Sequence, residues 1–121
     1  MMSKIEVVKG EGSRLVHPSH PFSRFKGLDM LVVDGVEAGA VWFEFQGEEA
    51  VLKILYIKPE ERGKGYGFRF LEWLEGEARR RGLRRVRVMG GFNTSLYGRA
   101  GYARTRGGWV KELEVQGGKE R

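Results

Sequence analysis

Alternating and β-branched hydrophobic positions predict strands in the first part of the chain. Residues 4–9 alternate apolar and polar side chains, which predicts a short strand. Residues 28–33 and 36–45 are rich in aliphatic residues, and Asp34-Gly35 between them is a strong hairpin signal because glycine accepts positive φ. The sequence therefore predicts a strand followed by a β-hairpin.

The segments around these strands have distinct patterns. Residues 10–27 contain histidines, prolines and serines with weak periodicity, and we expect a loop with at most a short helix. Gly39 inside a strand indicates a bulge or a close approach of another backbone. After a turn at residues 46–48, residues 51–57 are apolar on both faces, which predicts a central strand covered on both sides.

The second half begins with a helical pattern. Residues 66–81 are predicted to be helical, and Gly82 is a favourable stop. The apolar face of this helix is formed by Gly67, Phe70, Leu71, Leu74 and Ala78. Residues 83–89 alternate again, with Val86 and Val88 on one side and Arg85 and Arg87 on the other, which predicts a strand.

The pattern in the C-terminal part of the chain predicts a short helix and a hairpin. Residues 93–100 have room for a short helix, and residues 102–104 and 109–115 are expected to form a hairpin around Gly107-Gly108. We expect residues 117–121 to fray. The element order predicts one domain over residues 1–121, of the α/β (α+β) class, with a single mixed, mostly antiparallel central sheet flanked by helices.

Composition narrows the class of protein. The chain has 121 residues, 40% of them hydrophobic, which suits a single folded domain. It contains no cysteine, so disulfides, thiol catalysis and cysteine-ligated metal are excluded, and we expect no metal site. No apolar run is long enough for a membrane span or a secretory signal, so we expect a cytoplasmic protein.

The net charge of +6 favours polyanionic partners. Arginines gather at residues 79–81 and 84–85, where they form either a solvated helix end or a site for an anionic partner. Nucleic acid, an anionic membrane and a phosphorylated cofactor are all compatible with the sign of the charge.

The segment 55–67 carries the most specific chemistry. A strand, a glycine-rich turn and a helix N-terminus make an anion site, because the first amides of a helix have no internal partner. Arg62 and Lys64 add positive charge beside it. The run matches neither a Rossmann fingerprint nor a Walker loop, which need other spacings and other partner residues.

This segment resembles the acyl-CoA loop of the GNAT superfamily of N-acetyltransferases, whose pattern is (Q/R)-x-x-G-x-(G/A). Arg62, Gly65 and Gly67 match its fixed positions, and the loop lies between a central strand and a long helix, as in that family. Residues 96–102, Leu-Tyr-Gly-Arg-Ala-Gly-Tyr, are similar to the family's L-Y-x-x-x-G-(F/Y). The resemblance covers residues 28–115 and implies an enzyme that transfers an acyl group, by default acetyl, from acyl-CoA to an amine.

The resemblance also implies a cofactor site. Backbone groups of the loop would bind the CoA pyrophosphate, and the end of the preceding strand would hydrogen-bond the pantetheine arm. The loop residues concerned are Arg62, Gly63, Lys64, Gly65, Tyr66 and Gly67, and the strand residues are Leu55, Tyr56 and Ile57. Asn93 corresponds to a CoA-contacting asparagine, but it lies four residues before Tyr97 and not the usual seven.

For catalysis, the resemblance implies that Tyr97 is the general acid that protonates the leaving thiolate. Lys53 occupies the position of an acidic residue that helps deprotonate the amine in many members. Glu44, acting through a water, or His17 or His20 from the loop could replace that base, and Lys53 could instead favour an anionic acceptor.

The acceptor is left open, as a small molecule or a peptide that bears an amine. The short segment 10–27 lacks room for two full helices, so the site could be open or completed by a second copy in a homodimer. Phe22, Phe25 and Trp42 either line this site or pack in the core. Two alternatives to an enzyme remain: a non-catalytic acyl-CoA-binding module and a basic nucleic-acid-binding protein that uses residues 79–87.

Overall fold

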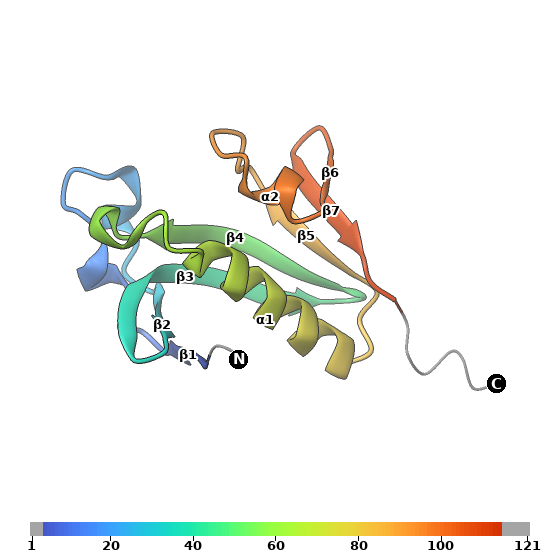
Figure 1. The fold of residues 1–121 in the computed structure, drawn as a ribbon, viewed down its shortest axis with the longest axis horizontal. Helices are drawn as coiled ribbons and strands as arrows, with labels where there is room; N and C mark the ends of the chain where they lie inside the picture. The colour runs from blue at the N-terminus through green and yellow to red at the C-terminus, as the bar shows by residue number, and fades with distance from the viewer. Residues whose placement is uncertain (1–3, 115–121) are drawn as a thin grey trace. The chain divides into compact units, whose positions relative to one another are not determined.

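The computed structural model describes residues 4–114, and Figure 1 shows its helices and strands. Two α-helices are present among them, α1 (Tyr66–Arg80) and α2 (Leu96–Arg99). The strands are β1 (Ile5–Val8), β2 (Asp29–Val33), β3 (Val36–Gln46), β4 (Glu49–Ile57), β5 (Arg85–Met89), β6 (Ala103–Arg104) and β7 (Gly108–Glu112). Short 3-10 turns cover Ser13–Leu15, Pro21–Arg24 and Pro59–Glu61.

The strands form one seven-stranded mixed sheet in the order β1-β2-β3-β4-β5-β7-β6. β4 is its middle strand, as its two apolar faces predicted, and it runs parallel to β5. The pairs β1–β2, β2–β3, β5–β7 and β6–β7 are antiparallel. The predicted fold class, a mixed and mostly antiparallel sheet with helices, is therefore confirmed. No helix within residues 4–114 is long and apolar enough to cross a membrane.

Two compact units make up the chain, one from residues up to 42 together with 54–70, the other from 43–53 together with 71 onward. In the first unit, a cluster of buried side chains forms the core. Its members are Val16, Leu28, Ala40, Ile54 and Tyr56. The segment 10–27 reaches this core through Val16 and holds two 3-10 turns, so the prediction of a loop without a full helix is confirmed.

The turn between β2 and β3 has the predicted hairpin geometry. Asp34 has a φ of 51° and Gly35 a φ of 83°, the two positive values that a type I′ turn requires. The Asp34 side chain also accepts a hydrogen bond of 2.8 Å from the amide of Lys4. This turn therefore joins β2 to β3 and fixes the start of β1.

Gly39 on β3 fulfils both predictions made for it. The β2–β3 register shifts between Leu31 and Val32, which leaves Ala38 as the extra residue of a bulge. A Cβ on Gly39 would lie 1.8 Å from the carbonyl oxygen of Tyr56 on β4. Because backbone atoms lie that close, this position has no room for any side chain.

Alanine at Gly39 and alanine at Gly76 should therefore have opposite effects. Gly39→Ala forces β3 away from the Tyr56 carbonyl and should prevent stable folding. Gly76 lies within α1 with no atom within 4 Å of its would-be Cβ, so Gly76→Ala should stabilise the protein by about 0.5–1 kcal/mol. Thermal and urea unfolding of the two variants measure this. Equal stabilities would contradict the close approach at Gly39.

In the second unit, β5 and the β6–β7 hairpin lie beside α2 (Figure 1). Val86 and Val88 are buried while Arg85 and Arg87 are partly exposed, as the alternation predicted. Gly82, with a φ of 74°, follows the last turn of α1, and the Leu83 amide donates to the Ala78 carbonyl at 2.9 Å. The glycine therefore ends the helix as expected.

The last hairpin turns earlier than predicted. Its turn comprises Thr105, Arg106 and Gly107, and Gly108 is the first residue of β7. The Thr105 hydroxyl accepts a hydrogen bond from the Gly108 amide at 3.0 Å, which closes the turn. A Cβ on Gly108 would lie 1.8 Å from the Val88 carbonyl oxygen, so this glycine serves strand packing and not the turn. Residue 115, the end of the predicted strand, and the predicted frayed tail 117–121 lie outside the described residues.

A row of charges crosses three strands of the second unit. Glu49 on β4 accepts hydrogen bonds from Arg87 on β5 at 3.0 Å and from Arg85 at 3.4 Å. Arg85 also contacts Glu112 on β7 at 3.0 Å. The hydrogen bond from Arg87 is the main cause that lowers the pKa of Glu49. We call these four residues the charge row.

Candidate functional site

The glycine-rich loop after β4 has a backbone that only glycine adopts readily. Gly63 and Gly65 have φ values of 80° and 83°, in the left-handed region. α1 begins directly afterwards at Tyr66, and the Arg69 amide donates to the Gly65 carbonyl at 3.0 Å. The amides that precede Arg69 in this first turn have no carbonyl partner further back in the helix. The loop therefore presents N–H groups at the positive end of a long helix, an arrangement suited to a phosphate.

The two cationic side chains of the loop are engaged within the first unit. The Arg62 Nε donates to the Ile57 carbonyl at 2.8 Å, and its guanidinium lies 5.5 Å from the centroid of the Tyr56 ring. Lys64 forms a 2.9 Å ion pair with Glu61, whose hydrogen bond raises the pKa of the lysine. Arg62 thus fixes the end of β4 against the loop, a structural role that the sequence did not indicate.

Tyr56 ties the segment 10–27 to this loop. Its ring is buried at 3% exposure and lies 4.8 Å from the His20 ring, and its hydroxyl accepts a hydrogen bond from the His17 amide at 3.2 Å. Leu55 and Ile57 on either side are half-buried. The backbone of these three residues is the predicted pantetheine contact, and the register between β4 and β5 ends before it, at Leu52↔Val88.

Tyr97 lies on α2 and is 5% exposed. Burial raises the pKa of its phenol to about 12. Its ring is 6.1 Å from the rings of Tyr102 and Trp109, and Gly91 packs so closely that a Cβ there would lie 2.5 Å from the tyrosine ring. Within residues 4–114, the Tyr97 hydroxyl forms no hydrogen bond.

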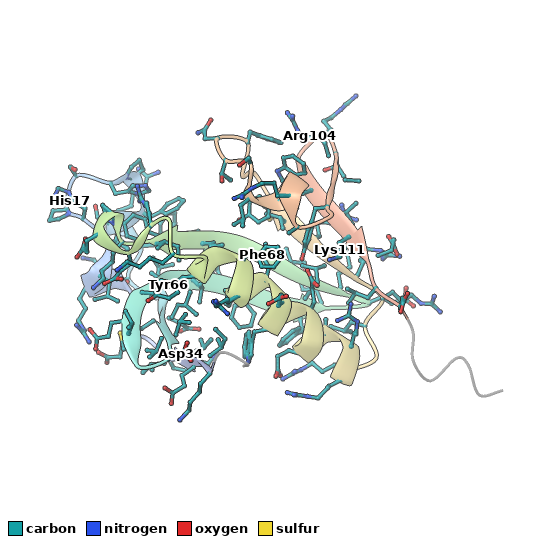
Figure 2. The ribbon with its side chains drawn as sticks, in the orientation of Figure 1. His17, Asp34, Tyr66, Phe68, Arg104 and Lys111 are labelled. Carbon is teal, nitrogen blue, oxygen red and sulfur yellow. The ribbon has the colours of Figure 1, made fainter. Side chains whose placement is uncertain are left out.

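A buried polar network lies beneath Tyr97. Glu75 on α1 is 6% exposed and accepts a 2.8 Å hydrogen bond from the Tyr102 hydroxyl. Lys111 on β7, labelled in Figure 2, donates to Glu75 at 3.3 Å and to the Ala100 carbonyl at 2.9 Å. Because the Tyr102 amide also donates to the Tyr97 carbonyl, at 3.0 Å, the network holds the end of α2 in place.

This network was not predicted from the sequence, although one signal for it is present there. Glu75 falls on the predicted apolar face of α1, between Leu71 and Ala78. A carboxylate at such a position requires a buried partner, because an unpaired charge in a core is costly. That signal does not identify Tyr102 and Lys111, which lie far along the chain.

Lys111→Met should destabilise the protein by about 3 kcal/mol, because it leaves the Glu75 carboxylate buried with one partner fewer. The double variant Glu75→Gln with Lys111→Met should recover most of this loss, since Tyr102 can still donate to the glutamine oxygen. Urea unfolding of the single and double variants checks the coupling. Additive losses would contradict the assignment.

The other predicted site residues, which are Asn93, Glu44 and the two histidines, each have their own local contacts. Asn93 lies in an exposed turn before α2, not within the helix. Glu44 on β3 accepts a hydrogen bond from Lys53 on β4 at 3.3 Å, so the lysine in the position of the expected acid is paired with the candidate base. The Nδ1 atom of His17 accepts a hydrogen bond of 3.1 Å from the amide of Ser19. The Nδ1 atom of His20 accepts one of 3.1 Å from the amide of Phe22.

The three candidate acceptor-lining residues, Phe22, Phe25 and Trp42, pack against the core of the first unit. Phe25 lies between the other two, with ring centroids 6.2 Å from Phe22 and 6.1 Å from Trp42. Of the two roles considered for these residues, lining the acceptor site or packing in the core, the structure shows core packing. Within residues 4–114, no group of three or more histidine, aspartate or glutamate side chains could hold a metal.

The arginines proposed as a nucleic-acid site are largely matched by carboxylates. The pairs are Arg80 and Arg81 with Glu77, Arg84 with Glu48, and the charge row already described. Apart from Arg79, the arginines of residues 79–87 therefore form structural ion pairs.

Comparison with known families gives one result. The model of the acetyltransferase (GNAT) family matches residues 11–107, which is most of the chain and includes both motifs. No curated protein sequence is significantly similar to the chain.

Several solved structures are similar in fold. Ard1 from Thermoplasma volcanium has a TM-score of 0.71 at 12% identity, covering 94% of this chain and 99% of that one. The ribosomal-protein-S18-alanine N-acetyltransferase of Escherichia coli has a TM-score of 0.66 at 18% identity, covering 94% of both chains. N-acetylglutamate synthase from Neisseria gonorrhoeae, complexed with coenzyme A and L-arginine, has a TM-score of 0.68 at 15% identity; 93% of this chain matches 34% of that protein's length. At these identities the similarity establishes a shared fold.

Proposed function

Because the chain belongs to the GNAT acetyltransferase family, whose members use acyl-CoA, we propose that it transfers an acetyl group from acetyl-CoA to a primary amine. The amine attacks the thioester directly. No covalent enzyme intermediate is needed, since the chain has no cysteine and no nucleophile elbow.

The loop geometry is the observation that carries this proposal. Two glycines with positive φ turn the backbone directly into the first turn of α1, at the spacing of the family motif. In our proposal the amides of residues 62–67 bind the CoA pyrophosphate, and the helix dipole adds to the attraction. The backbone of Leu55, Tyr56 and Ile57 binds the pantetheine arm as an additional strand would.

Tyr97 is the proposed general acid. The amine nitrogen bonds to the thioester carbon, and the C–S bond breaks as the tetrahedral intermediate collapses. The phenol proton then passes to the leaving sulfur, and water returns a proton to the phenolate. The phenol is protonated at neutral pH, and burial raises its pKa further, to about 12.

Glu44 is the proposed base, acting through a water on the incoming ammonium. Its carboxylate lies 3.3 Å from the ammonium of Lys53. The same pairing favours a second candidate function, a non-catalytic acyl-CoA-binding module, because the lysine occupies the position of the acid found in many members. Replacement of Tyr97 by phenylalanine separates these two functions.

Isothermal titration with acetyl-CoA tests the proposal. We expect one site per chain, together with thiol release when an acceptor amine is supplied. Desulfo-CoA, which keeps the pyrophosphate and pantetheine but lacks the thiol, should bind at the same site. The absence of heat at millimolar acetyl-CoA would refute both the enzyme and the binding module.

A further inference from the structure

The second unit contains a long stretch without acidic residues. Between Glu77 and Glu112 there is no aspartate or glutamate, while arginines occur throughout. Apart from Arg79, the arginines at the helix end and on β5 form ion pairs with carboxylates at or beyond the limits of this stretch. By contrast, Arg99, Arg104 and Arg106 have no carboxylate within 4.0 Å among the residues that the structure describes. Positive charge therefore remains unmatched around α2 and the β6–β7 hairpin.

Arg104 in this hairpin has a defined position. It pairs with Trp109 across the β6–β7 ladder, and its guanidinium lies 5.7 Å from that ring and 4.2 Å from the Phe92 ring. Figure 2 shows Arg104 on the hairpin. A guanidinium stacked on aromatic rings keeps its N–H edge available for a planar anion. Phe92 is 45% exposed, so this arrangement is at the surface.

The same tryptophan connects Arg104 to the proposed general acid. The Trp109 ring is 6.1 Å from the Tyr97 ring, and its Nε1 donates to the Gly91 carbonyl at 3.0 Å. Gly91 in turn packs directly on the Tyr97 ring. Arg104 and Tyr97 thus both lie next to the same aromatic side chain, that of Trp109.

We propose that Arg104 binds an anionic group, a carboxylate or a phosphate, carried by the acceptor amine. This inference rests on the proposed acetyltransferase function and names the chemical class of its acceptor. Arg106 and Arg99 add positive charge nearby, which disfavours polycationic amines by repulsion. A carboxylate or phosphate matches the guanidinium in a bidentate way that a neutral hydroxyl or amide does not.

Matched acceptor pairs test the proposal, with acetyl-CoA held at saturation and thiol release as the readout. One pair is ethanolamine phosphate with ethanolamine, and another is glycine with glycinamide; spermidine is the polycation. We expect kcat/KM for the anionic member of a pair to exceed that for its neutral partner by at least about tenfold.

Arg104→Gln should remove this preference while leaving acetyl-CoA affinity and thermal stability unchanged. Arg104→Lys keeps the charge but loses the planar N–H donors of the guanidinium, so it should keep part of the preference for anionic acceptors. Arg80→Gln is the matched control, because Arg80 is an exposed arginine of α1 that is paired with Glu77. It should leave the preference intact.

The outcomes separate this inference from the proposed function. Failure of acetyl-CoA to bind would refute the proposed function and the inference with it. If acetyl-CoA binds, equal use of both members of each pair, a preference for spermidine, or no turnover of any anionic member would overturn the inference alone. An anionic preference that persists in Arg104→Gln would also overturn it.

Discussion

Gly65→Val is expected to abolish measurable binding of acetyl-CoA. Gly65 has a φ of 83°, which β-branched residues hardly ever adopt. A Cβ there would have no atom within 4 Å, so backbone conformation and not crowding makes the change harmful. A left-handed L-residue costs roughly 1–2 kcal/mol, and relief of that strain would turn the loop amides away from the pyrophosphate. Calorimetric titration measures the loss.

Gly35→Val is the matched control for this variant. Gly35 has the same φ of 83° and equally open surroundings, but it lies in the β2–β3 turn and outside the cofactor loop. Both variants should lose similar stability on thermal unfolding, and only Gly65→Val should lose acetyl-CoA binding. If Gly65→Val binds as tightly as Gly35→Val, the loop does not bind the pyrophosphate.

Tyr97→Phe is expected to lower kcat by about 100-fold and to leave the dissociation constant for acetyl-CoA unchanged. The change removes the proton that the leaving sulfur needs, while the ring contacts with Trp109 and Gly91 remain. No hydrogen bond of the Tyr97 hydroxyl is found within residues 4–114, so its loss should cost little stability. Unchanged turnover would favour the binding-module alternative or a different acid.

The neighbouring Tyr102 provides the contrasting control. Its hydroxyl donates to buried Glu75, so Tyr102→Phe should lower stability by about 1–3 kcal/mol and affect kcat less than Tyr97→Phe does.

The pH dependence of the wild-type rate gives a second test of Tyr97 as the general acid. Since burial raises the pKa of Tyr97 to about 12, its acid form persists through neutral and mildly alkaline pH. The wild-type rate should therefore show no loss from this group until the pH approaches that value.

Much of the fold could be predicted because local patterns and tertiary environment agree. Residues 83–89 alternate valine with arginine, and the structure buries the valines of β5 and leaves its arginines partly exposed. Asp34-Gly35 adopts the turn that its residue types favour. The loop that ends at Gly65 joins a strand to a helix as its glycines predicted, because positive φ is a local property that favours glycine.

The remainder depends on contacts between distant residues. Gly108 resembled a turn residue, but its absent side chain makes room for the carbonyl of Val88, twenty residues earlier. The stacking of Arg104 on Trp109 follows from the β6–β7 register, which the predicted hairpin around Gly107-Gly108 would have changed. The positions of such residues depend on how strands pair, and strand register cannot be read from a single sequence.

The charge row has a consequence for how the sheet behaves on heating. β4 and β5 form a parallel pair, and parallel ladders are slightly weaker per residue than antiparallel ones. Glu49 holds both Arg85 and Arg87, so a slip of one residue between these strands would break contacts with two arginines. The desolvation cost of ion pairs falls as temperature rises, whereas hydrophobic stabilisation levels off. The row should therefore keep the two strands in register at temperatures where the apolar packing around them has begun to loosen.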